Sequence, residues 1–174
     1  RTARAFAVAG MPVERFRKEK ELVHNLQQNL LVVFADAEGE LAKSLMRIRY
    51  ESAAFREMSA DFRFMAIPTN GDRLAESQKL AAEIGLEDQL EDSSFAVVIL
   101  NQDAEKVAEF GQQILADDKS QIDLDRLLRR LDPLRTKPLD GHKLLADALA
   151  QATRDNKRVL LQETATWCGP CYML

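Results

Sequence analysis

The chain has 174 residues, of which 46% are apolar and 30% charged, and its formal net charge is −4. This composition is typical of a globular protein with a hydrophobic core. The absence of a dense basic patch argues against a nucleic-acid partner, and no apolar run approaches the roughly 18 residues that a membrane span requires.

The first part of the chain is predicted to be an upstream segment followed by a helix. Residues 1–12 are small, apolar and basic without a clear period, as expected for the end of a preceding domain or part of a leader. The chain begins with Arg1 and shows no signal peptide, so we expect it to be a piece of a longer protein. Pro12 is suited to open a helix that runs to about Asn29.

Apolar strands and amphipathic helices then alternate. Residues 30–34 form a continuous apolar run, which is typical of a buried parallel strand. A helix is predicted over residues 40–58, and a second strand over residues 61–67, ended by Pro68. The helix over residues 40–58 carries one mainly apolar stripe, made of Leu41, Leu45, Ile48, Ser52 and Phe55. The next helix ends at Gly85 as its C-cap, and its inner face carries Leu74, Ser77, Ala81 and Ile84.

Residues 95–100 and 105–110 predict a hairpin of two strands. Ser120, with Asp123 three residues later, predicts a helix cap. A final amphipathic helix follows, marked by Leu124, Leu127, Leu128 and Leu131. The order of elements predicts an α/β domain with a central four-stranded mixed sheet, in which the β-α-β half is parallel and the hairpin is antiparallel.

A linker and a partial repeat follow this domain. Residues 133–139 include two prolines and no apolar period, so they predict a linker. Residues 140–174 then repeat the pattern of helix, strand, turn and helix start. On this register residues 159–161 match the first strand, and residues 168–171 match residues 39–42.

The most specific motif is Trp167-Cys168-Gly169-Pro170-Cys171, which contains both cysteines of the chain. Cys168 at the start of a helix would meet unpaired N–H groups and a helix dipole that favour a thiolate. Cys171, one turn later, is close enough to form a disulfide with it. Pro170 suits a first helical turn, where its missing N–H costs nothing. A bare C-x-x-C could equally be half of a zinc site, with further ligands supplied from elsewhere.

This motif, after an apolar strand, resembles the active site of thioredoxin, and the elements of residues 13–132 resemble the thioredoxin fold with its leading helix. The resemblance implies tandem thioredoxin-like domains, the second cut off soon after its active site at Leu174. It implies thiol–disulfide exchange with protein substrates through Cys168 and Cys171. The Gly-Pro between the cysteines implies that reduction of substrate disulfides is favoured over their formation, and the electron donor is not identified. The resemblance implies no organic cofactor and no metal.

Two departures from the family concern the first domain, which has no cysteine and, near Ser94-Phe95, no proline where thioredoxins carry a cis-proline. They imply a redox-inactive copy that serves as a binding module or spacer. In the second domain, Gln162 stands where thioredoxins bury an aspartate that helps to move a proton, and Glu163 replaces an aromatic. The resemblance therefore implies that Cys168 attacks the substrate, but it does not extend to the proton transfer that the buried aspartate assists in thioredoxins.

Other interpretations of the chain remain open. It could be a non-catalytic protein-interaction module with a vestigial or metal-binding C-x-x-C, or a redox-sensing switch. His24 and His142 are predicted to be surface residues, and Arg129-Arg130 a solvated helix face. Three methionines are predicted to fill the core, namely Met46, Met58 and Met65. The multidomain architecture alone points to an extracytoplasmic, periplasmic bacterial location, with the cytoplasm left open.

Overall fold

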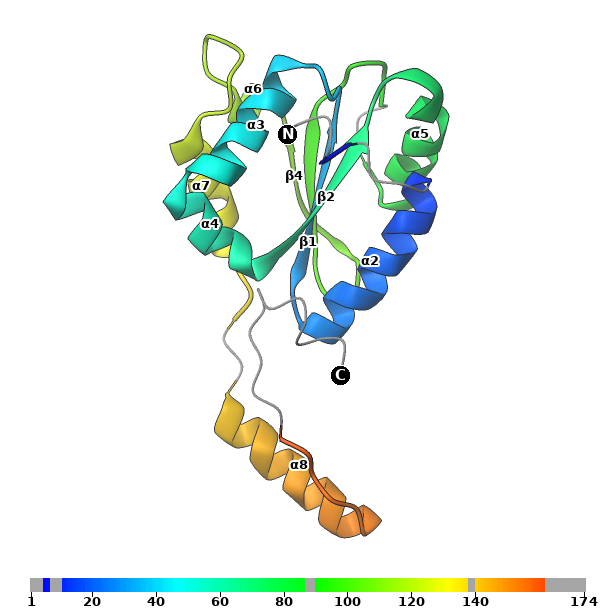
Figure 1. Ribbon diagram of the computed structural model, residues 1–174, viewed down its shortest axis with the longest axis vertical. Helices are drawn as coiled ribbons and strands as arrows, with labels where there is room; N and C mark the ends of the chain where they lie inside the picture. The colour runs from blue at the N-terminus through cyan, green and yellow to red at the C-terminus, as the bar shows by residue number, and fades with distance from the viewer. Residues whose placement is uncertain (1–4, 7–10, 87–89, 138–139, 162–174) are drawn as a thin grey trace. The chain divides into compact units, whose positions relative to one another are not determined.

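The computed structural model describes residues 5–6, 11–86, 90–137 and 140–161 of the chain. The chain divides into two compact units, Arg1–Arg135 and Thr136–Leu174, which we call the first and second units (Figure 1). Each unit is described by itself.

A four-stranded mixed sheet forms the centre of the first unit (Figure 1). Its strands are β1 (Asn29–Ala35), β2 (Phe62–Pro68), β3 (Ala96–Leu100) and β4 (Lys106–Gly111). They lie in the order β2-β1-β3-β4, with β1 parallel to β2 and antiparallel to β3, and with β4 antiparallel to β3. The predicted α/β class, the parallel β-α-β half and the antiparallel hairpin are confirmed.

Helices cover both faces of the sheet (Figure 1). One face is covered by α2 (Pro12–Leu26) and α5 (Leu74–Glu83), and the other by α3 (Glu40–Glu51), α4 (Ala53–Met58), α6 (Gln112–Leu115) and α7 (Leu124–Leu131). Because successive strand side chains point to opposite faces, Leu31 and Val33 pack with the second group, and Leu30 and Val32 with the first. Because both faces of β1 are buried, its residues form an unbroken apolar run.

Two predicted helix boundaries are wrong. Helix α2 ends at Leu26, because Gln27 takes a left-handed conformation (φ 52°) and Asn29 already belongs to β1. The helix predicted over residues 40–58 is two helices. Ser52 between them is extended (φ −78°, ψ 119°), and its hydroxyl accepts a 3.2 Å hydrogen bond from the backbone N–H of Phe55. Ser52 is thus an N-cap rather than part of a helical stripe.

At the predicted caps, one position is confirmed and one is wrong. Gly85 has φ +72°, and Leu86 N–H donates to the Ala81 carbonyl at 2.9 Å, the bond of a Schellman motif. The N-cap of α7 is Asp123, whose carboxylate accepts from the Arg126 N–H at 2.9 Å. Ser120 is instead a turn residue with φ +56°. The short helix α6 between β4 and α7 was not predicted.

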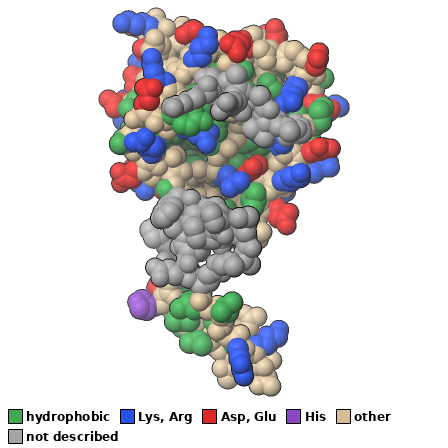
Figure 2. Space-filling view, viewed as in Figure 1, with side chains coloured by type: hydrophobic (Ala, Val, Ile, Leu, Met, Phe, Trp, Pro, Cys, Tyr) green, Lys and Arg blue, Asp and Glu red, His purple; other side chains and the backbone are tan. Residues whose placement is uncertain are grey.

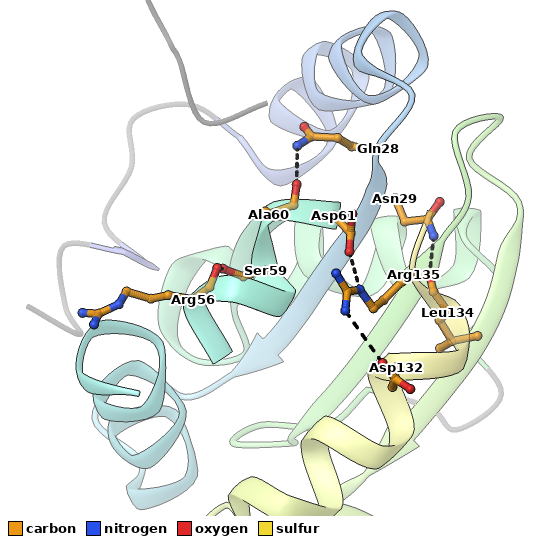
Figure 3. Close-up of polar contacts among 9 residues, drawn as sticks. All are labelled: Gln28, Asn29, Arg56, Ser59, Ala60, Asp61, Asp132, Leu134 and Arg135. Atoms are coloured by element: carbon orange, nitrogen blue, oxygen red, sulfur yellow. Dashed lines mark hydrogen bonds and ion pairs between the residues drawn. The ribbon is translucent and has the colours of Figure 1, made fainter. Parts of the chain in front are cut away.

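A cluster of polar contacts fastens the end of the first unit to the start of its sheet (Figure 3). The Asn29 side-chain amide donates to the Leu134 carbonyl at 2.7 Å. The guanidinium of Arg135 donates to the Asp61 carboxylate at 2.5 Å, and this contact raises the pKa of Arg135. Residues 133–135, within the predicted linker, are therefore attached to the first unit.

In the described part of the second unit, a single helix is present, α8 (Gly141–Asp155), which begins at Asp140 as its N-cap. None of the residues of α8 is buried, and apolar side chains gather along it (Figure 2). Leu144 and Leu149 are each 51% exposed. Residues 159–161 do not form the predicted strand: Leu160 and Leu161 are 91% and 76% exposed, whereas a strand is stabilised by pairing with a neighbour.

Candidate functional site

The redox motif lies outside the described residues, together with Gln162 and Glu163. The expected roles of Cys168 and Cys171, and of Trp167, Gly169 and Pro170 in supporting them, therefore stay predictions. The residues that the structure describes contain no cysteine and no group of three His, Cys, Asp or Glu side chains placed to hold a metal. None of the described helices is both long and apolar enough to cross a bilayer.

The first unit has a strand-to-helix junction at Gly39, the position that the sequence register matched to Cys168. Gly39 is the N-cap of α3, four residues after β1, so its predicted place at a junction is confirmed. Its N–H donates to the Asp36 carbonyl at 3.0 Å. The Asp36 carboxylate accepts from the Glu38 N–H at 3.0 Å and from the Asn70 amide at 2.5 Å. These bonds hold the turn that leads from β1 into α3.

A second segment, residues 91–95, enters β3 and is attached to the end of β2 through Thr69. The Thr69 side chain is fully buried, and its hydroxyl donates to the Ser94 carbonyl at 2.9 Å. In return, the Ser93 N–H donates to the Thr69 carbonyl at 3.0 Å. Ser93 adopts φ +61°, a conformation that these two bonds and the Ser94 hydroxyl's bond with the Glu91 N–H support.

These two segments line a groove of about 230 Å³ at the N-terminal end of α3, which we call the α3 groove. Its walls are Ala35, Asp36, Gly39, Glu40, Leu41, Ala42, Ser93, Phe95, Gln112 and Ser120. Lys43 lies beside it, and a 3.0 Å hydrogen bond with Glu40 raises the pKa of Lys43. The described walls contain no cysteine, so they offer no thiol for disulfide exchange, but the groove has room for a ligand.

The remaining residues singled out in the sequence lie where they were expected. His24 is exposed, and its Nδ1 lies 3.5 Å from the Asp103 carboxylate. His142 is exposed on α8, and Arg129 and Arg130 are exposed on α7. The methionines Met46, Met58 and Met65 are buried in the core.

Several groove residues were not predicted. Gln112, at the start of α6, and Ser120, in the turn before α7, come from separate segments, and only the tertiary fold brings them into the walls beside Gly39. Two sequence signals pointed to this end of the sheet: the register that placed Gly39 at a junction, and the resemblance that placed Ser94-Phe95 where thioredoxins carry a cis-proline.

Comparison with known proteins adds a fold relationship. No family model matches the chain, and no curated protein matches it. A solved structure described as a disulphide isomerase from Xylella fastidiosa Temecula1 matches with a TM-score of 0.56 at 13% identity, covering 73% of this chain and 98% of that one. The chain thus has a thioredoxin-like α/β fold with a four-stranded mixed sheet flanked by helices. At this identity the likeness concerns the fold alone.

Proposed function

We propose that this chain belongs to a thiol–disulfide oxidoreductase with tandem thioredoxin-like domains, in which the second unit exchanges disulfides with protein substrates. The observation that carries the proposal is the Trp167-Cys168-Gly169-Pro170-Cys171 string, which follows a unit of thioredoxin-like fold. A zinc half-site requires only the two cysteines, whereas the intervening Gly-Pro and the preceding Trp add nothing to metal binding.

In the proposed reaction, the Cys168 thiolate attacks one sulfur of a substrate disulfide, and the other substrate sulfur leaves as a thiolate. The product is a mixed disulfide between Cys168 and the substrate. The Cys171 thiolate then attacks Cys168, which releases the substrate as a dithiol and leaves a Cys168–Cys171 disulfide. A dithiol electron donor must reduce that disulfide before the next turnover, and no organic cofactor or metal is needed.

The first unit is proposed to act as a redox-inactive binding module or spacer. Its α3 groove occupies the strand-to-helix junction where a redox-active copy would carry its thiols, and its walls combine the apolar Leu41 and Phe95 with the carboxylates of Asp36 and Glu40. Such a mixture can hold an extended segment of a substrate without reacting with it.

The exposed stripe of α8 supports a further domain around the motif. Leu145 and Leu149, at positions i and i+4, lie on one face of the helix, and neither is buried. We propose that this face packs against the sheet of the second thioredoxin-like domain, because removing its apolar side chains from water would stabilise that domain.

The test is insulin reduction by dithiothreitol, measured on the chain expressed with all the sequence that its gene encodes. The wild type should accelerate the reaction, Cys168→Ser should abolish turnover, and Cys171→Ser should accumulate mixed disulfides that non-reducing electrophoresis detects. A protein that accelerates nothing, with both variants behaving like the wild type, would leave the non-catalytic interaction module as the better account.

A further inference from the structure

Helices α6 and α7 enclose a second groove on the first unit, apart from the α3 groove. Its volume is about 590 Å³, and it is lined by Gln113, Ile114, Arg126, Arg129 and Arg130. We call it the arginine groove. The three arginines follow one another at positions i, i+3 and i+4 of α7, a spacing that places them on one side of the helix. The opposite side carries Leu127 and Leu131, which are fully buried in the core.

The three arginines differ in their partners. Arg126 donates to the Ala116 carbonyl at 2.8 Å, and its Nε lies 3.4 Å from the Asp123 carboxylate. Arg129 and Arg130 are exposed, and neither forms a hydrogen bond or ion pair with any residue that the structure describes. Like charges at i and i+4, such as Arg126 and Arg130, repel one another on a helix surface.

The carboxylates of Asp117 and Asp123 interact with Arg126 and leave Arg129 and Arg130 unpaired among the described residues. Asp117 accepts the backbone N–H groups of Lys119 and Gln121, both at 2.9 Å, and these bonds lower the pKa of Asp117. Asp123 caps α7. None of the described residues that line the groove is acidic. The groove is therefore a positively charged recess in which the guanidinium groups of Arg129 and Arg130 retain unused donors.

We propose that the arginine groove binds an acidic segment of a partner protein. A guanidinium group presents donors in a planar fork that fits a carboxylate with two parallel hydrogen bonds, so Arg129 and Arg130 can each take one acidic side chain. Ile114 supplies an apolar contact for a side chain between them. The recess is far larger than the roughly 30 Å³ share of a single water molecule in the liquid, so it fits several side chains of a peptide better than one small anion.

This inference concerns the first unit alone and holds whether or not Cys168 and Cys171 exchange disulfides. The test uses the full chain and a short fluorescent peptide in which glutamates alternate with leucines, with fluorescence anisotropy as the readout. The wild type should bind the peptide saturably, and rising salt should weaken binding because exposed charges are screened. A peptide with glutamines in place of the glutamates should not bind.

The decisive variant is Arg129→Gln/Arg130→Gln, which should weaken peptide binding at least about tenfold, since it removes two charge-assisted contacts. Both side chains are exposed, so the variant should keep the wild-type circular dichroism spectrum and melting temperature. The matched control is Arg17→Gln/Lys20→Gln, which removes the same charge from exposed positions on α2. It should bind the peptide as the wild type does.

Three outcomes would overturn the proposal. Equal losses in the two double variants would mean that net charge, rather than this groove, attracts the peptide. An unchanged affinity in the α7 variant would place the peptide elsewhere. Full displacement of the peptide by inorganic phosphate, at concentrations where sodium chloride of equal ionic strength has no effect, would identify a small-anion site instead.

Discussion

The side-chain amide of Asn29, the first residue of β1, donates a 2.7 Å hydrogen bond to the backbone carbonyl of Leu134, 105 residues later in the chain. The Asn29 residue is 9% exposed, so this bond forms where water cannot easily replace it. Together with the pair Arg135–Asp61, it anchors the last residues of the first unit at the end of the sheet where β1 and β2 begin (Figure 3).

Replacing Asn29 by Ala should therefore lower the free energy of unfolding of the first unit by about 1 kcal/mol, because it removes the part-buried hydrogen bond to the Leu134 carbonyl. Urea denaturation followed by circular dichroism measures the change. The control is Asn25→Ala, an exposed position on α2, which should change stability by less than about 0.5 kcal/mol. Equal effects of the two substitutions would contradict a special role for the Asn29 bond.

Residues 1–137 should fold by themselves, since the first unit contains a complete sheet with helices on both faces. Thermal unfolding of this fragment should be cooperative. A shorter fragment that ends at Leu131 should melt at a lower temperature, because it lacks Leu134 and Arg135 and leaves Asn29 and Asp61 without these partners. A broad, non-cooperative melt of the longer fragment would show that the boundary is misplaced.

Thr69→Val should loosen the segment that enters β3 while keeping the shape of the side chain. The variant loses the 2.9 Å bond from the Thr69 hydroxyl to the Ser94 carbonyl, at an expected cost of about 1 kcal/mol. Hydrogen exchange at the Ser93 amide should speed up more than exchange at amides in the middle of β1. Unchanged protection at Ser93 would mean that Thr69 does not hold this wall of the α3 groove.

Asp117 should make the stability of the first unit depend on pH. Its pKa is lowered in the folded state by the N–H groups of Gln121 and Lys119. A lowered folded pKa means that the stabilising contribution is present above the ordinary carboxyl pKa of about 3.9 and disappears as the pH falls through the folded value. Asp117→Asn should thus lower the urea midpoint at neutral pH, and the difference from the wild type should shrink as the solution is acidified toward that range. A difference that stays constant with pH would rule out this origin.

The sequence predicted the sheet of the first unit well, for a physical reason. Strands β1 and β3 are buried on both faces, so they read as unbroken apolar runs such as Phe95 to Leu100. Gly85 was also identified, because glycine adopts the left-handed conformation at a helix end without strain. Such features depend on neighbours in the chain and leave a local signal.

Other features depend on tertiary contacts that no local pattern reports. Ser52 breaks a continuous helical period because its hydroxyl caps α4, and an apolar stripe cannot reveal that choice. Residues 159–161 have the composition of a strand, but a strand forms only beside a partner. The sequence predicted Arg129 and Arg130 to be an ordinary solvated helix face. It could not predict the groove, because the other lining residues, Gln113 and Ile114, come from a separate helix.

The central claim, that Cys168 is the attacking thiol, is tested most directly by the pH dependence of its alkylation by iodoacetamide. The measurement uses the Cys171→Ser variant of the chain, expressed with all the sequence that its gene encodes. Cys168 at the N-terminus of a helix should show a thiolate transition well below the ~8.5 of a free cysteine. In the 174-residue chain alone, where the motif is followed by only three residues, the shift should be smaller. A transition near 8.5 in the longer protein, identical to that of a free thiol, would contradict the account.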